Sequence, residues 1–354
     1  MSGIVILCAS AGLGTYVPAV QLYRYLLTQE CPVSIEVLEC LFSPDKLTQI
    51  KAARGRFQND FRFALTARKA VGLHSPAGCL DIDKRSVLLN RWKETGKTRF
   101  IVFSGFWLPL LREYQESICD ELTVDCVQME VVFSPSWSAH LTEYPFPMRF
   151  IWFYSSSQGG VLQTLLPVSV TPTRRRRGLV LHGGGWQLGN YNQSVPALVG
   201  AGYSLLVGRS QDQPCLPPPN VQYFRIHPSW ETWTAHSGDY PPVEVRGEGD
   251  FPVPHDAGSH WLLQQIMTSS GIVSKPGGAT LLDSLTAATP VVFTTPYGET
   301  EAQNSRLWCS LGLGMTLADW ESSDYSEELL AQSQERLWAA RAALPSYAET
   351  LLAA

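Results

Sequence analysis

Three glycine-rich turns are the parts of the sequence best suited to hold a ligand. Each follows an apolar run that predicts a strand, and glycine lets a ligand approach the backbone closely. Exposed N–H groups at the start of a helix favour anions such as phosphate. The turns span residues 9–15 (ASAGLGT), 182–186 (HGGGW) and 274–280 (SKPGGAT). A tight strand-to-helix connection would explain any one of them, but three together favour a site for phosphate.

The turns do not match the two best-known phosphate-binding motifs. The first contains G-x-G without the third glycine of G-x-G-x-x-G, and the chain has no G-x-x-x-x-G-K-[ST]. The sequence therefore gives little support to a dinucleotide-binding or P-loop protein.

The elements around the first turn predict a doubly wound α/β domain over residues 1–166. Residues 3–10 form an apolar run bounded by glycine, which is typical of a buried parallel strand. A helical apolar stripe follows at Ala19, Leu22, Tyr23 and Leu26. Further strands are expected at 34–39, 99–106, 126–133 and 150–154.

A second domain of the same kind is expected over residues 178–322, after a linker at 167–177 that contains the run Arg174–Arg177. Strands of a parallel sheet are expected at 179–182, 204–207, 271–274 and 291–294, and helices at 261–267, 280–288 and 301–311. Residues 214–259 predict a long loop. Residues 323–354 predict C-terminal helices, the first being an amphipathic helix at 324–344 capped by Ser322 or Ser323.

Composition agrees with two globular domains and excludes several classes of protein. The 354 residues are 45% apolar and 17% charged, which argues against disorder, and a net charge of −5 argues against a nucleic-acid binder. The most apolar stretch, 100–111, is broken by Ser104, Gly105 and Pro109, so no spanning helix is expected. The start lacks a basic export signal, and the eight cysteines form no C-x-x-C pair. These features predict a cytoplasmic protein without a zinc or disulfide framework.

The third turn and its surroundings resemble a known family. The segments 271–285, 290–293 and 296–304 are similar to the donor-binding half of GT-B glycosyltransferases. The similarity is to the branch that includes the peptidoglycan N-acetylglucosaminyltransferase, diacylglycerol glucosyltransferases and UDP-glycosyltransferases, which carry K-P-G-G-x-T-x-x-E followed by Q/E-x-x-N. The resemblance implies two Rossmann-like doubly wound domains that face a cleft, followed by a C-terminal amphipathic helix.

The resemblance also implies roles for residues in the second domain. It assigns the donor diphosphate to Gly183, Gly184, Gly185, Gly277, Gly278 and Thr280. It assigns the ribose to Asp283 and the donor sugar to Glu301, Gln303 and Asn304. Asp283 is one methylene shorter than the usual glutamate of the family. An ordinary solvated helix start is the alternative for the last three residues.

The N-terminal turn departs from the family at its last position. Related enzymes often show G-x-G-H, whereas here Gly12 and Gly14 are followed by Thr15. A threonine cannot act as a base near pH 7. Thr15 is therefore expected to be a positioning element. Three alternatives stay open: the acceptor is nucleophilic enough without a base, the chemistry differs, or another residue takes the proton, with His140 as one candidate. Asp81, Asp83 and Glu143 are further candidates.

The resemblance implies an inverting, metal-independent transfer of a sugar from a nucleotide-sugar, with UDP expected, to a small-molecule acceptor. No cofactor is expected, and the oligomeric state is left open. The alternatives are a nucleotide-sugar hydrolase or 2-epimerase of the same fold, or a catalytically silent subunit of a complex. The basic and aromatic stretch 46–69 leaves peripheral contact with an anionic membrane open, although a solvated face is the preferred interpretation.

Overall fold

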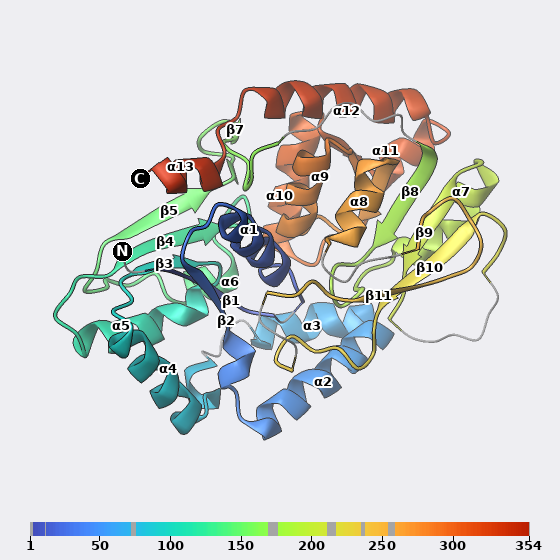
Figure 1. Ribbon diagram of the computed structural model, residues 1–354. Helices are drawn as coiled ribbons and strands as arrows, with labels where there is room; N and C mark the ends of the chain where they lie inside the picture. The colour runs from blue at the N-terminus through green and yellow to red at the C-terminus, as the bar shows by residue number, and fades with distance from the viewer. Residues whose placement is uncertain are drawn as a thin grey trace. The chain divides into compact units, whose positions relative to one another are not determined.

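The computed structural model describes residues 3–10, 12–71, 76–168, 176–210, 217–234, 238–253 and 259–353. By their contacts, the residues divide into two compact units. Unit 1 consists of Met1–Trp152 together with Glu231–Asp239, and unit 2 consists of Phe153–Trp230 and Tyr240–Ala354. Each unit contains one large sheet with helices (Figure 1).

The sheet of unit 1 has five parallel strands in the order β2-β1-β3-β4-β5. The strands are β1 (Ile4–Cys8), β2 (Val33–Val37), β3 (Arg99–Val102), β4 (Thr123–Gln128) and β5 (Met148–Trp152). All five residues of β1 are buried, as expected for a central strand covered on both faces. The predicted doubly wound domain is therefore confirmed for this unit.

The helices of unit 1 connect these strands. They are α1 (Tyr16–Thr28), α2 (Pro44–Asn59), α3 (Phe61–Val71), α4 (Ile82–Glu94), α5 (Leu108–Glu116) and α6 (Pro135–Ser138), with 3-10 turns η1 (Leu38–Leu41), η2 (Pro76–Cys79) and η3 (Gly105–Trp107). Aromatic rings fill the core around Trp92, which meets Phe100 and Tyr114 edge to face at centroid distances of 5.0 and 5.4 Å. Such pairs add to the stabilisation that comes from area burial alone.

The sheet of unit 2 has seven strands in the order β11-β10-β9-β8-β12-β13-β14. The strands are β8 (Arg176–His182), β9 (Ser204–Gly208), β10 (Val221–Ile226), β11 (Val243–Arg246), β12 (Ser269–Ser274), β13 (Val291–Phe293) and β14 (Gly314–Thr316). All neighbours are parallel except β10 and β11. The expectation of a purely parallel sheet is therefore wrong at this edge.

The prediction of a long loop at 214–259 is also wrong, because β10 and β11 both lie within this segment. In β10 the buried Val221, Gln222 and Phe224 are interrupted by less buried residues, and prolines flank both strands. A short edge pair with this mixed pattern has a weak strand signal. Residues 214–216, 235–237 and 254–258 of the segment lie outside the described part of the chain.

The helices of unit 2 largely follow the predicted ranges. They are α7 (Val195–Gly200), α8 (Trp261–Met267), α9 (Gly278–Ala287), α10 (Glu299–Ser310), α11 (Leu317–Ser322), α12 (Glu327–Ala342) and α13 (Tyr347–Ala353), with a 3-10 turn η4 (Tyr191–Ser194) and a small hairpin of β6 (Tyr154–Ser155) and β7 (Gly160–Val161).

The predicted helix 324–344 begins later than expected. Asp324 and Tyr325 have φ angles of 55° and 57°, which a right-handed helix cannot contain. The helix instead begins after Ser326, whose hydroxyl accepts a hydrogen bond from the N–H of Leu329. Ser322 and Ser323 are therefore not its caps. The helix that corresponds to the expected one is α12, and its buried residues Leu330, Ser333, Leu337 and Arg341 include two polar side chains.

The division between the units falls earlier than the expected linker 167–177. Residues after Trp152 already contact unit 2: the Tyr154 hydroxyl donates to the carbonyl of Gly278 at 2.6 Å, and the N–H of Thr164 donates to Pro345 O at 2.9 Å. Residues 169–175, including Arg174 and Arg175, lie outside the described residues.

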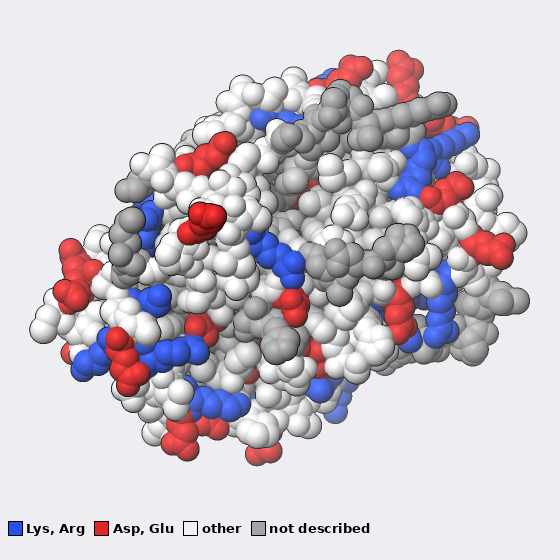
Figure 2. All heavy atoms as spheres, viewed as in Figure 1, with Lys and Arg blue, Asp and Glu red and all other residues white. Residues whose placement is uncertain are grey.

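The described surface has mixed charge. On the face drawn in Figure 2, basic and acidic residues are interspersed. Within the described ranges, none of the helices combines the length and apolar character that a membrane crossing needs.

Candidate functional site

The second and third glycine turns lie side by side in unit 2. Strands β8 and β12 pair so that His182 lies opposite Ser274, and the Ser274 hydroxyl donates to the His182 carbonyl at 2.7 Å. Each turn directly follows one of these strands. The fold thus brings two of the predicted phosphate-binding turns to the carboxyl end of neighbouring strands, where open α/β sheets bind ligands.

The turn 274–280 leads directly into α9. Gly277 is the N-cap residue, and its extended backbone places the first amides of the helix at the turn. A Cβ atom at Gly277 would lie 3.3 Å from Lys275 Nζ and 3.6 Å from Glu301 Oε1. The turn therefore sits directly beside a charged pair. Thr280 is buried in the first turn of the helix.

Lys275 and Glu301 form that pair, and neither is well exposed. Lys275 Nζ donates to Glu301 Oε1, and the two side chains are 15% and 10% exposed. The other oxygen, Oε2, accepts the N–H of Tyr297 at 2.6 Å. Both carboxylate oxygens of Glu301 therefore already accept hydrogen bonds from the protein. The implied role of Glu301 as a reader of sugar hydroxyls stays a prediction, while its observed contacts fix the ammonium of Lys275.

Asn304 and Gln303 also make contacts within the protein. Asn304 is fully buried, and its Nδ2 donates to the carbonyl of Pro276 at 2.7 Å. This hydrogen bond ties the backbone of the turn to α10. Gln303 Nε2 donates to Glu299 at 2.9 Å on the helix surface. Asn304 therefore lies at the turn, whereas the hydrogen bond of Gln303 among the described residues is to Glu299 of its own helix.

Lys275 is a further candidate for the site, and it was not singled out from the sequence although it stands in the K-P-G-G element. A signal was present, because a lysine directly before a glycine turn supplies the positive charge that a diphosphate requires.

His182 closes the turn on the other side. Its Nδ1 accepts the N–H of Gly184 at 3.2 Å, and its buried Nε2 has no hydrogen-bond partner among the described residues. Burial and the charge of Lys275 lower the pKa of His182 to about 4. The imidazole is therefore neutral at pH 7, with an unused ring nitrogen that can bond a ligand.

His260 is a second histidine near this turn, and sequence reasoning missed it. Burial and the charge of His182 lower its pKa to about 4. Its ring stacks on Tyr240 at a centroid distance of 5.2 Å. It lies at the start of α8, 14 residues before the turn 274–280, and no spacing rule linked it to that turn.

Two backbone amides of the turn 182–186 already donate hydrogen bonds to nearby side chains. The N–H of Gly183 donates to Gln187 Oε1 at 3.1 Å, and a Cβ at Gly183 would lie 2.1 Å from Leu188 O. Gly184 has a φ angle of +73°, which favours glycine. Because the amides of Gly183 and Gly184 already have acceptors, their predicted diphosphate contact requires those bonds to be shared or exchanged. Gly185 has no such contact described.

Asp283 lies in the second turn of α9. The structure gives its carboxyl group no hydrogen-bond partner among the described residues. Burial raises the pKa of Asp283 from 3.8 to about 7. A carboxyl group in this condition can accept hydroxyl hydrogens from a ligand, as the family resemblance implies for the ribose.

Thr15 is fixed to its own turn in unit 1. Its hydroxyl donates to Ala9 O at 2.6 Å and accepts the N–H of Ala9 at 3.3 Å. Gly12 has a φ angle of +83°. Gly14 is exposed and a Cβ there would meet nothing within 4 Å. Thr15 therefore closes the loop between β1 and α1.

A buried carboxylate, Glu39, also supports this turn and was not singled out from the sequence. It is 2% exposed, and its Oε2 accepts the N–H of Ser10 at 2.8 Å. It follows β2, which is the neighbour of β1, so the carboxyl ends of both strands hold the loop.

His140 lies in unit 1 after α6. Its ring meets Phe106 edge to face at 5.8 Å, and burial followed by the charge of Arg112 lowers its pKa below 6.5. Its buried Nε2 has no hydrogen-bond partner among the described residues. No hydrogen bond joins it to Thr15 in the described part of the chain, so the two predicted catalytic residues are not shown to act as a pair.

Replacing Thr15 by alanine tests whether Thr15 is a positioning element of this turn or a general base. Because the hydroxyl is occupied by Ala9, we expect Thr15→Ala to reduce turnover less than about tenfold, whereas loss of a general base costs roughly 10²- to 10⁴-fold. Stability should fall by about 1 kcal/mol through the lost hydrogen bond. Steady-state kinetics and thermal unfolding measure both. A turnover loss in the larger range with intact donor affinity would contradict the expectation.

Metal ligands do not gather in the described ranges. No group of three or more His, Cys, Asp and Glu residues there is arranged to hold an ion.

Comparisons with known proteins agree with the fold. Neither a family model nor a curated protein matches the sequence. Among solved structures, the glycosyltransferase SsfS6 of Streptomyces sp. SF2575, complexed with thymidine diphosphate, is similar with a TM-score of 0.59 and 15% identity, over 99% of this chain and 98% of that one.

Two further structures resemble the chain over nearly their whole length. The glycosyltransferase VinC in complex with dTDP has a TM-score of 0.56 and 12% identity, over 98% of this chain and 97% of that one. MurG of Acinetobacter baumannii has a TM-score of 0.51 and 14% identity, over 99% and 98%. The chain therefore has the GT-B fold of these glycosyltransferases, with two Rossmann-like units.

Proposed function

We propose that the protein is a glycosyltransferase that moves a sugar from a nucleoside diphosphate sugar to a small-molecule acceptor. One observation carries the proposal: the K-P-G-G turn at the start of α9 combines helix amides, the fixed ammonium of Lys275 and the neutral His182. These groups suit a diphosphate. The GT-B fold and the nucleotide-bound structures that share it support the same assignment.

The proposed chemistry is a single displacement with inversion. An acceptor oxygen attacks the anomeric carbon, the bond from that carbon to the diphosphate breaks, and the nucleoside diphosphate leaves with the electron pair. Lys275 and the amides of Gly278 and Thr280 stabilise the charge on the leaving group without a required metal ion. His140 is the proposed proton acceptor, because its buried Nε2 has no hydrogen-bond partner among the described residues and because burial lowers the pKa of the imidazole, which favours its neutral form.

The donor belongs to unit 2 and the acceptor to unit 1 in this proposal. Asp283 is assigned to the ribose because its carboxyl group lies on α9 with no described hydrogen bond. UDP is the donor nucleotide implied by the K-P-G-G element, while the similar structures SsfS6 and VinC carry thymidine diphosphate. Both nucleotides therefore belong in the test. No cofactor is proposed beyond the nucleotide-sugar.

A nucleotide-sugar hydrolase or 2-epimerase is the second candidate. It is favoured by one observation, namely that Thr15 replaces the histidine of the family and is bonded to Ala9.

Incubation with UDP-glucose and TDP-glucose, with and without a mixture of small hydroxylated acceptors, separates the two candidates. A glycosylated acceptor detected by mass spectrometry supports the transferase. Release of free sugar, or of an epimer, at a rate that acceptors do not change would support the second candidate. If neither UDP nor TDP binds in calorimetry, both are excluded.

A further inference from the structure

Part of the chain between β10 and β11 belongs to unit 1, although both strands belong to unit 2. The segment Glu231–Asp239 makes its contacts within unit 1. Its described parts are residues 231–234 and 238–239, which we call the strap. The chain thus leaves unit 2 after Trp230 and returns to it at Tyr240.

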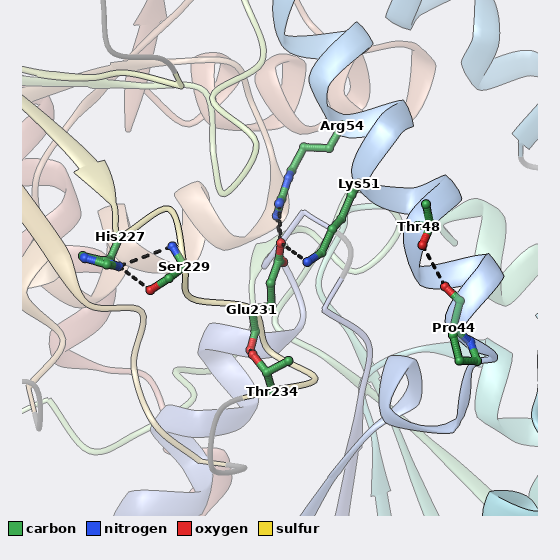
Figure 3. Close-up of polar contacts among 8 residues, drawn as sticks. All are labelled: Pro44, Thr48, Lys51, Arg54, His227, Ser229, Glu231 and Thr234. Atoms are coloured by element: carbon green, nitrogen blue, oxygen red, sulfur yellow. Dashed lines mark hydrogen bonds and ion pairs between the residues drawn. The ribbon is translucent and has the colours of Figure 1, made fainter.

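The first anchor of the strap is a buried carboxylate. Glu231 is 5% exposed and accepts two hydrogen bonds from the Arg54 guanidinium on α2, at 3.0 and 2.6 Å. Lys51, one helical turn away, lies 3.5 Å from the same carboxylate and 5.6 Å over the ring of Trp233. Figure 3 shows Arg54 and Lys51 pointing from α2 toward Glu231. Breaking such a buried bidentate pair is costly, because it leaves a charge without a partner.

The second anchor is on α1. Arg24 donates to the carbonyl of Gly238 at 2.8 Å and to the carboxylate of Asp239 at 3.1 Å, and the Tyr16 hydroxyl donates to Asp239 O at 2.7 Å. Gly238 has a φ angle of +100°, and a Cβ there would lie 2.5 Å from the ring of Tyr23. The strap is therefore fitted to the surface of α1 as well as to α2.

The second anchor lies at the functional edge of the unit 1 sheet. Tyr16 is the first residue of α1, which follows the turn after β1. Ligands of open parallel sheets bind at the carboxyl ends of the strands, and that is where this turn lies.

We propose that the strap forms one wall of the acceptor site of unit 1 and that the Arg54–Glu231 pair holds it in place. This inference rests on the proposed function. Arg54 and Glu231 are then positioning residues, which act through the strap and leave the binding of the donor nucleotide unchanged. When the wall is released, bulk water reaches the acceptor position and competes as the nucleophile.

The test compares Glu231→Gln and Arg54→Gln with two controls at exposed side chains. Arg56→Gln changes a neighbouring arginine on α2, and Glu248→Gln changes a carboxylate after β11, outside the strap. We expect hydrogen exchange of residues 231–234 to become at least tenfold faster in the first pair only. Hydrolysis of UDP-glucose or TDP-glucose without acceptor should rise at least threefold, while the Kd of UDP and TDP stays within twofold. The exchanged pair Arg54→Glu with Glu231→Arg, combined with Lys51→Glu because Lys51 also contacts Glu231, should restore both properties.

The outcomes separate the inference from the proposed function. Unchanged hydrogen exchange would overturn the anchor, and faster exchange with unchanged hydrolysis would overturn the acceptor wall while leaving the glycosyltransferase intact. If the wild-type protein neither binds nor hydrolyses either donor, the proposed function is wrong, and the acceptor wall with it. Hydrogen exchange of the variants still shows whether the Arg54–Glu231 pair holds the strap. If Glu231→Gln does not fold, Arg54→Lys keeps the charge, loses the bidentate geometry and allows the same comparison.

Discussion

Replacing Lys275 by methionine is expected to weaken the binding of UDP and TDP by roughly 10- to 100-fold. The change removes the only ammonium that contacts Glu301 in the described turn, and hydrogen bonds to charged groups contribute about 1.5–3 kcal/mol each. Affinity for uridine and thymidine, which lack phosphate, should stay nearly the same. Calorimetry with the four ligands measures the ratio directly.

The same substitution is expected to destabilise the fold, which calls for a matched variant. Without Lys275, the nearly buried Glu301 has lost its counter-charge, and breaking a buried pair costs about 3–5 kcal/mol. Lys275→Met combined with Glu301→Gln removes that charge and should recover much of the stability. If the double variant binds UDP as tightly as the wild type, Lys275 has only a structural role and the proposed diphosphate contact is wrong.

Replacing Asp283 by asparagine is expected to change how stability depends on pH. Burial raises the pKa of this carboxyl from 3.8 to about 7, so the folded state holds its proton where the unfolded state has lost it. The free energy of unfolding of the wild type therefore falls as the pH rises from about 4 to 7, and levels off above 7. Linkage gives a loss of about 2–3 kcal/mol between pH 5 and 8.

Asp283→Asn cannot ionise and should lack this loss. Urea unfolding at pH 5, 6, 7 and 8 measures it, and Glu248→Gln, which changes an exposed carboxylate, is the control that should follow the wild type. Parallel pH profiles for Asp283→Asn and the wild type would show that Asp283 is already charged in the folded protein, and that its assignment as an uncommitted ribose ligand needs revision.

The central strands and the glycine turns could be predicted from the sequence because both depend on local pattern. Strand β1 is an unbroken apolar run, and the helix after the K-P-G-G turn begins where its glycines end. The break before α12 was not predicted. It depends on positive φ angles at Asp324 and Tyr325, and the usual sequence signal for such angles is a glycine or an asparagine, which is absent here. The same limit applies to β10 and β11, whose alternation is too short to stand out among prolines.

The chemistry of the site was harder to predict than its location. Lys275 and Glu301 are 26 residues apart, and Arg54 and Glu231 are 177 residues apart, so no spacing rule links either pair. The basic stretch 46–69 illustrates the consequence. It could be read as a surface for anionic lipid, yet Lys51 and Arg54 are engaged by a carboxylate that only the fold brings to them. The side chains of Arg68 and Lys69 lie outside the described residues.

The route of the chain through the strap affects how the protein is made. Unit 1 requires Glu231 and Asp239, which leave the ribosome only after β8, β9 and β10 of the other unit have been synthesised. The first 152 residues can form their parallel sheet during translation. The carboxylate partners of Arg24, Lys51 and Arg54 are synthesised only 79 to 87 residues later, at Glu231 and Asp239. Expression of residues 1–152 alone should therefore yield a domain with exposed cations on α1 and α2, and with slower, less complete folding than the full chain.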